Sequence, residues 1–206
     1  MMRFALAATA VAASISFAAM PAHADDAACM ARFKELLSRI NDKVGPVRIH
    51  TFSESAGYKS EGYFYSAGDG SIDGMSEPIE PKGGMWSLFR GNKMWFSNDG
   101  KKWQFGRVMD AASDPEAVKQ SLKKNAETAS KTRCGEEELD GVTYEVVEGE
   151  YVNSMAQNAV TQEKWWVRKE NGFVTRHEAT SNGAGGKFYS LQIIEAWPDL
   201  KLPDPE

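Results

Sequence analysis

The sequence predicts an α+β protein built around an antiparallel β-sheet. Short runs rich in Val, Ile, Tyr, Phe and Trp recur along most of the chain, and turns containing Gly, Asn or Asp separate them. Only two segments after the N-terminal region space their apolar residues as a helix does. The order is one helix, about five strands, a second helix and about four strands. Because strands joined by short turns pair antiparallel, this order predicts a meander.

The first 24 residues have the composition of a secretory signal peptide. Arg3 supplies the positive charge, residues 4–19 form an Ala-rich apolar stretch, and small residues precede the expected cleavage after Ala24. The stretch is shorter than the roughly 20 residues that a transmembrane helix needs. We therefore expect export to a bacterial periplasm and a single mature domain over residues 25–206.

Charge and cysteine content narrow the possible functions. Without its leader the chain carries 23 basic and 29 acidic residues, a net charge of −6, which makes it a poor candidate for binding nucleic acid or an anionic membrane surface. Its only cysteines, Cys29 and Cys134, predict a disulfide in an oxidising compartment. The alternatives are lipidation of Cys29, although residues 26–28 lack the apolar residue of a lipobox, and a metal pair, although no His or third Cys is adjacent.

Two helices are predicted. The first covers residues 28–43, where five apolar residues form one stripe that Val44 continues, and Gly45 and Pro46 end it. The second covers residues 114–130; Asp114 or Ser113 caps it and Pro115 occupies the first turn. Its apolar stripe is narrow, so it can cover a sheet but cannot anchor deep inside one.

The strands follow from runs of β-forming residues. Those predicted before the second helix are 47–53, 60–67, 85–89, 93–97 and 102–107, and those after it are 142–152, 163–169, 173–180 and 187–197. Residues 68–84 are predicted to form a loop around at most one weak strand, and the acidic run Glu136–Glu138 a solvated loop.

Several predicted strands are apolar on both faces. Trp165 and Trp166 must point in opposite directions, and Ile193 and Ile194 do the same. A sheet with one solvated face would alternate apolar and polar residues. Either protein covers both faces, or one face lines a cavity that holds an apolar ligand. The candidates for the lining of such a cavity are Trp86, Trp95, Trp103, Phe105, Trp166, Leu191 and Ile193.

No catalytic or cofactor motif is present. His50 and His177 are the only histidines after the leader; each lies alone in a predicted strand, without the spacing of a metal site. No Gly-x-Ser-x-Gly elbow or phosphate-binding loop occurs. We expect no catalytic residue, no metal and no cofactor. An enzyme built on the sheet remains an alternative, and it would place His50 or His177 in a polar cluster inside a pocket.

Three segments resemble the bacterial outer-membrane lipoprotein carrier (LolA-like) superfamily, which also includes envelope-stress regulators and mycobacterial lipid-binding lipoproteins. Residues 86–103 are similar to its repeated short strands with a Gly-Asn-Lys turn, and residues 140–146 to another of its strands. The most specific segment is residues 166–176, a tryptophan strand, an Asn-Gly turn and a returning strand with a basic residue.

The resemblance implies an unclosed half-barrel, a strongly curved antiparallel sheet of about 9–11 strands with the two helices across its concave face. It also implies a non-enzymatic periplasmic protein that binds or carries a hydrophobic or lipid-like ligand with acyl chains. Envelope lipoproteins or membrane-bound proteins would be further partners. The helices would act as a lid, for which Gly83-Gly84 and Gly185-Gly186 provide flexible points. The alternative is a periplasmic protein–protein interaction module or envelope-stress regulator with the same fold and a filled core.

Overall fold

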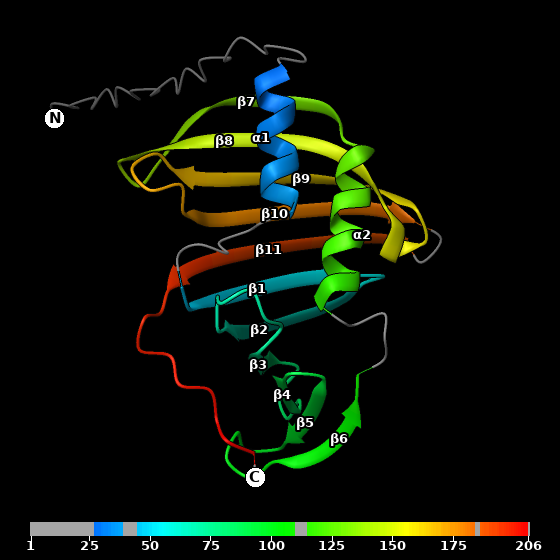
Figure 1. Cartoon of the computed structure of the whole chain (residues 1–206), viewed down its shortest axis with the longest axis vertical. Helices are drawn as coiled ribbons and strands as arrows, with labels where there is room; N and C mark the ends of the chain where they lie inside the picture. The colour runs from blue at the N-terminus through cyan, green and yellow to red at the C-terminus, as the bar shows by residue number, and fades with distance from the viewer. Residues whose placement is uncertain (1–26, 39–44, 110–114, 184–185, 206) are drawn as a thin grey trace, which may run out of the picture.

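Eleven antiparallel strands form one sheet, and two helices cross one of its faces (Figure 1). The computed structural model describes residues 27–38, 45–109, 115–183 and 186–205, so the predicted signal peptide lies outside the described residues. The strands are β1 (Val47–Ser55), β2 (Tyr58–Ser66), β3 (Gly74–Glu80), β4 (Trp86–Arg90), β5 (Lys93–Ser97), β6 (Gln104–Val108), β7 (Ser130–Leu139), β8 (Val142–Asn153), β9 (Ala159–Arg168), β10 (Val174–Gly183) and β11 (Gly186–Ala196).

The chain enters the sheet at its centre. From β1 it moves strand by strand to the edge strand β6, and α2 (Pro115–Glu127) then carries it to the opposite edge strand, β7. From β7 it returns strand by strand until β11 pairs with β1. The two edge strands do not pair with each other, so the sheet is a half-barrel that stays open, with both helices on its concave side (Figure 1).

α1 (Ala27–Ser38) packs on β7 and β8, and its buried residues form the main core with residues of β8 to β11 and of β1. Phe33 is fully buried, and its ring meets the edge of Trp165 at a centroid distance of 4.9 Å. Gly149 of β8 makes room for this ring, because a Cβ at that position would lie 2.5 Å from the nearest atom of Phe33. The disulfide between Cys29 and Cys134, predicted from the sequence, is present and ties α1 to β7.

α2 rests on the structure mainly near its C-terminal end. Its principal contacts are with α1, with β8 and with the short 3-10 helix η2 (Ser154–Ala156). Asn125 is buried there, and its side-chain oxygen accepts a hydrogen bond from the backbone N–H of Ser154 at 3.0 Å. The half-buried apolar residues Val118 and Leu122 lie nearer the other end of the helix.

Strand register assigns each side chain to a face. Trp165, His177, Gln192 and Thr51 lie directly opposite one another on successive strands, and Trp165 touches Phe33 of α1, so this row faces the helices. We call this the helix face. The neighbouring row of Trp166, Arg176, Ile193 and His50 points the other way, and we call that side the outer face.

Two segments differ from the sequence prediction. Residues 68–84 contain the full strand β3, which pairs with β2 and β4; Gly74 allows it to approach, because a Cβ there would lie 2.6 Å from the ring of Phe64. The acidic run Glu136–Glu138 is not a loop but part of β7, where it pairs with residues 143–145 of β8. Both segments contain residues that disfavour a strand in isolation. Pairing with neighbouring strands outweighs that local preference. Residues 39–43 of the predicted first helix lie outside the described residues.

Candidate functional site

The seven residues predicted to line a cavity do not lie beneath the helices. Register places the six strand residues among them on the outer face, and Trp103 lies just before β6. Trp95 and Trp166 are only 6% and 4% exposed, because protein groups cover them. Phe105, at the free edge of the sheet, is 59% exposed. If these side chains bind a ligand, they do so on the outer face and not in a cavity between the sheet and the helices.

Trp166 is held by charged neighbours on the outer face. Its indole N–H donates to a carboxylate oxygen of Glu137 at 2.8 Å. The Lys164 ammonium and the Arg176 guanidinium lie 4.6 and 4.8 Å from the centre of its ring. These contacts account for its burial and orient it within the sheet.

Ile193 lies beside a hollow of about 570 Å³ on the outer side, where the β9–β10 hairpin bends away from the end of β11. Tyr144, Arg168, Thr175 and Glu195 share its lining. The pairing of β9 with β10 shifts register beside Thr175, which opens the space. This hollow mixes charged, hydroxyl and apolar groups.

The helix face carries a different apolar surface on β1, β2, β4 and β5. Its members are half-buried, come from adjacent rows of the register and face the same side as Trp165. We define the helix-face strip as Ile49, Phe64, Phe89, Met94 and Phe96.

Glycines give the strip its shape. The ring of Phe64 lies over Gly74, and the ring of Phe96 lies over Gly106 so closely that a Cβ at either glycine would clash with it. An aromatic ring over a strand glycine covers backbone that would otherwise be solvated and fixes the register of the pair. Ser76 and Ser87 lie between the two rings in the same row, so small side chains separate Phe64 from Phe96.

Neither helix makes its main contacts with β2, β4 or β5; those contacts lie on β7, β8, η2 and between the helices themselves. Ile49 of β1 adjoins the main core, so it forms the inner end of the strip. α2 runs in front of the middle strands (Figure 1). At the far end, Phe96 borders a hollow of about 200 Å³ that Met85, Lys102 and Gln104 also line. The strip therefore reaches the molecular surface at the β5–β6 end of the sheet.

Polar residues occupy the middle of the helix face. His177 and Glu163 are buried, and the His177 Nε2 lies 2.7 Å from a carboxylate oxygen of Glu163. The hydroxyl of Tyr151 donates to the other oxygen of Glu163 at 2.8 Å. The imidazole also stacks on Trp165 with an angle of 8° between the rings. His177, Glu163 and Tyr151 each have a protein hydrogen-bond partner, as buried polar groups require.

The surroundings of His177 favour its charged form. Its Nε2 faces a carboxylate and its Nδ1 lies 3.2 Å from the side-chain oxygen of Gln192, so both nitrogens are placed to donate. Burial disfavours the imidazolium, but the hydrogen bond to Glu163 and the negative charge of that group outweigh it, and the pKa of His177 is raised. Burial and the same carboxylate raise the pKa of Tyr151.

His177 thus belongs to a polar cluster, as the enzyme alternative requires, but both ring nitrogens and both Glu163 oxygens are already engaged within it. His50 lies on the outer face, pairs with Glu61 at 2.8 Å and packs between the rings of Phe52 and Tyr63. In the part of the chain that the structure describes, no group of three His, Cys, Asp or Glu residues is arranged to hold a metal ion.

None of the helices in the described ranges is long and apolar enough to span a membrane.

Sequence reasoning missed the aromatic members of the strip. Met94 and Phe96 alternate with Trp95, so their opposite orientation could be read from the sequence. Which of the two faces lies under the helices could not, because it depends on the docking of α1 through Phe33 and Gly149.

Comparison with known proteins finds similar folds only among solved structures. One is a DUF1329 family protein from Desulfovibrio piger, at 12% identity over 81% of this chain and 88% of that chain, with a TM-score of 0.30. A candidate outer membrane lipoprotein-sorting protein domain from Vibrio parahaemolyticus has 12% identity, coverage of 84% and 92% and a TM-score of 0.37. A LolA superfamily protein from Nitrosomonas europaea has 11% identity, coverage of 86% and 93% and a TM-score of 0.34.

The superfamily that the sequence resembles is thus represented among these structures. No family model matches the chain, and no curated protein matches it significantly. At such TM-scores and identities the likeness does not extend to function, which has to be inferred from the site.

Proposed function

We propose that the protein binds a hydrophobic, lipid-like ligand against the helix-face strip and serves as a non-enzymatic binding or carrier protein. The observation that supports this most directly is that four apolar side chains of the strip, Phe64, Phe89, Met94 and Phe96, share the concave face and stay half-buried on strands outside the main helix contacts. Each methylene moved from water onto such a surface contributes about 0.8 kcal/mol. Binding would therefore strengthen with acyl-chain length and need few polar contacts.

The helix face changes character along β1, and this supports an amphiphile over a plain hydrocarbon. Ile49 belongs to the strip, whereas Thr51 and Ser53 follow on the same face. The Ser53 hydroxyl lies 2.7 Å from that of Ser60 on β2. Acyl chains would lie along the strip, and a polar head would meet these hydroxyl groups.

The compartment follows from covalent chemistry and the leader. The disulfide between Cys29 and Cys134 supports an oxidising environment. The predicted signal peptide supports export, so we place the protein in the periplasm. Envelope lipoproteins, whose acyl chains match the strip, are the partners that this location favours.

Two measurements test the proposal. Native mass spectrometry of freshly purified periplasmic protein, followed by organic extraction, should reveal a bound lipid. A fluorescent fatty-acid probe should bind the delipidated protein, and Met94→Asn should weaken that binding about tenfold by removing apolar contact. Val160→Asn is the matched control, because Val160 is 50% exposed on the outer face of β9.

The results separate the alternatives. Loss of probe binding in Met94→Asn alone supports the strip as the binding surface. A folded wild-type protein that carries no lipid and binds no probe would overturn the proposal and favour the interaction or regulatory module. Equal weakening in both variants would also overturn it, because the probe would then bind apolar surface without preference for the strip.

A further inference from the structure

The charge of the chain is distributed unevenly. Residues 81–109, which contain β4, β5, β6 and their turns, include six Lys or Arg and one Asp, a net charge of +5. The predicted mature chain as a whole carries −6, so the remainder carries −11. The negative net charge of the whole chain therefore hides a positive segment, residues 81–109. That segment can contact an anionic surface even though the rest of the chain is acidic.

The same segment exposes large apolar side chains. Met85 and Phe105 are each 59% exposed, and Val108 is 56% exposed. Single exposed apolar residues are ordinary, but these three are flanked by Lys82, Lys101 and other cations within one short sheet segment. Exposed apolar side chains surrounded by Lys and Arg are typical of the surfaces with which peripheral proteins bind anionic lipid interfaces.

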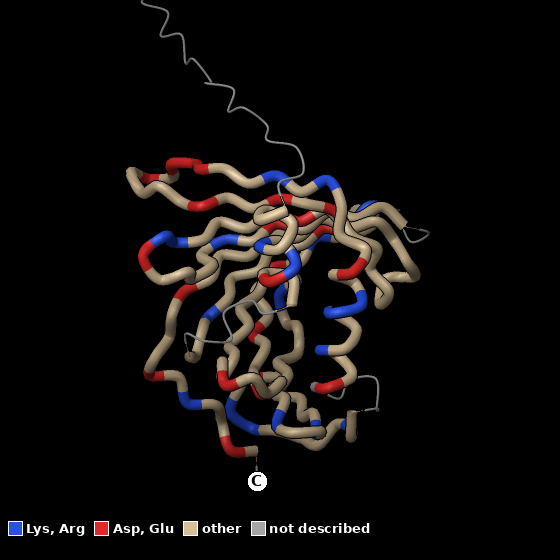
Figure 2. The backbone as a smooth tube through the Cα atoms, turned by 45° about the horizontal axis from the view of Figure 1, so that its top comes forward, with Lys and Arg blue, Asp and Glu red and all other residues tan. Residues whose placement is uncertain are grey.

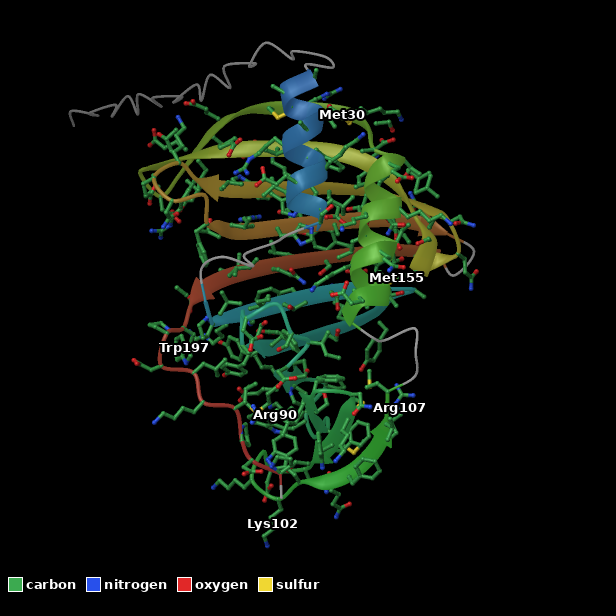
Figure 3. The ribbon with its side chains drawn as sticks, in the orientation of Figure 1. Met30, Arg90, Lys102, Arg107, Met155 and Trp197 are labelled. Carbon is green, nitrogen blue, oxygen red and sulfur yellow. A yellow bond between two sulfur atoms is a disulfide. The ribbon has the colours of Figure 1, made fainter. Side chains whose placement is uncertain are left out.

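This segment forms one end of the molecule. Figure 3 shows Arg90, Lys102 and Arg107 in its lower part, with Lys102 directed away from the sheet. The indole of Trp86 lies against Gly100, which brings the start of β4 next to the β5–β6 turn. The hollow lined by Met85, Phe96 and Lys102 opens here, so the helix-face strip meets the surface between an apolar and a basic side chain.

Nearby acids only partly offset this charge. The carboxylate of Asp99 accepts hydrogen bonds from the backbone N–H groups of Lys102 and Lys101, and these bonds lower its pKa to about 2. Arg90 lies 4.0 Å from Asp73. The C-terminal segment descends to the same end of the molecule (Figures 1 and 2), and its described residues after Trp197 add two Asp and one Lys. The end remains positive.

We propose that the β4–β6 end docks on an anionic phospholipid surface. Lys and Arg side chains would contact lipid phosphates, while Met85 and Phe105 enter the interfacial region. The hollow beside Phe96 and Met85 lies at the same end of the sheet, on the helix face and opposite to Phe105. The inference goes beyond ligand binding on the strip and does not depend on it.

The edge strand β6 is poorly suited to pair with an added peptide strand or with a second copy of the chain. Its pairing with β5 shifts register opposite Trp95, leaving Gly106 as an extra residue, and such a bulge twists an edge away from a further strand. Basic residues beside the edge, including Arg107, repel a second copy of the same end. A peptide added as a strand or a symmetric dimer is therefore less favoured than a lipid surface.

Vesicle flotation tests the proposal with the full mature protein. Vesicles of phosphatidylethanolamine and phosphatidylglycerol should bind it at low salt, and phosphatidylcholine vesicles should not. Lys82→Gln combined with Lys101→Gln should weaken binding roughly 25-fold, at about fivefold for each cation near an anionic surface. The matched control is Lys123→Gln combined with Lys124→Gln, an exposed pair on α2. Phe105→Ser should weaken the part of the binding that survives high salt.

The outcomes either support docking or overturn it. Selective loss in the Lys82 and Lys101 variant supports it. Absence of wild-type binding to anionic vesicles at low salt overturns it, as does equal loss in both double variants. Binding to an acidic polypeptide with no binding to vesicles would also overturn it. Neither exchanged lysine belongs to the helix-face strip, so fatty-acid probe binding is expected to be unchanged, and failure of one proposal is distinguishable from failure of the other.

Discussion

Replacing Gly149 with alanine tests how α1 is seated on the sheet. The added methyl carbon would lie 2.5, 2.7 and 2.9 Å from three ring atoms of Phe33, whereas carbon atoms pack at about 3.5–4.0 Å. Phe33 is fully buried and rests on Trp165, so its ring cannot turn away into solvent. Overpacking of this kind costs typically 1–3 kcal/mol, and the reduced entropy of the unfolded chain returns about 0.4–1 kcal/mol.

We therefore expect Gly149→Ala to lower the free energy of unfolding by about 1–2 kcal/mol. For a chain of this size that corresponds to a fall in Tm of roughly 2–8 °C, measured by circular dichroism with the disulfide intact. Gly183→Ala is the control, because its added carbon would lie 3.2 Å from the side chain of Ala159 near the end of a hairpin. This single contact is much milder than the overlap at Gly149, so Gly183→Ala should change the free energy of unfolding by less than Gly149→Ala does.

A double-mutant cycle decides whether the cause is the clash. Phe33→Leu removes ring atoms that meet the new methyl group, so Gly149→Ala should cost less in that background than in the wild type. If the losses in unfolding free energy of the two single variants add in the double variant, the new methyl group does not clash with Phe33. That result would refute the role of Gly149 in seating α1.

Two further predictions concern covalent and electrostatic stability. Replacing Cys29 and Cys134 with serine opens a loop of 105 residues and should lower the free energy of unfolding by up to about 4.7 kcal/mol, measured by urea denaturation; an unchanged midpoint would contradict this. Because the folded protein binds the His177 proton more tightly than the unfolded chain, the stability from its pair with Glu163 is present below the ordinary pKa of 6.5 and is lost as pH rises through the higher folded value. Stability should fall over that range in the wild type and fall less in His177→Gln; equal pH profiles for the two proteins would count against the pair.

Local signals predicted the elements well where each strand carried its own β-forming residues and a clear turn. The strand 93–97 was predicted with its observed bounds, and the Asn98-Asp99-Gly100 turn follows it. β3 and β7 escaped prediction because Gly74, Pro78 and the acidic run of β7 disfavour strands locally. Their pairing energy comes from neighbours that are distant in the sequence.

The candidate site was harder to predict than the fold. Alternation showed that Trp95 and Met94 face opposite sides, but only the docked helix identifies the side of Met94 as the concave one. The cation-rich segment 81–109 was visible in the sequence, yet the net charge of the whole chain concealed it. Charge counted by predicted strand group would have exposed it.

The pairing of β1 with β11 has a consequence for how the protein is made. Val47 lies opposite Ala196, so the first and last strands to emerge during synthesis must meet for the sheet to become continuous. Until then β1–β6 and β7–β10 are two separate parts of the sheet, and β1 and β10 each lack the neighbour that β11 provides. A chain truncated before β11 would keep both parts unjoined, so the sheet becomes continuous only when its last strand is present.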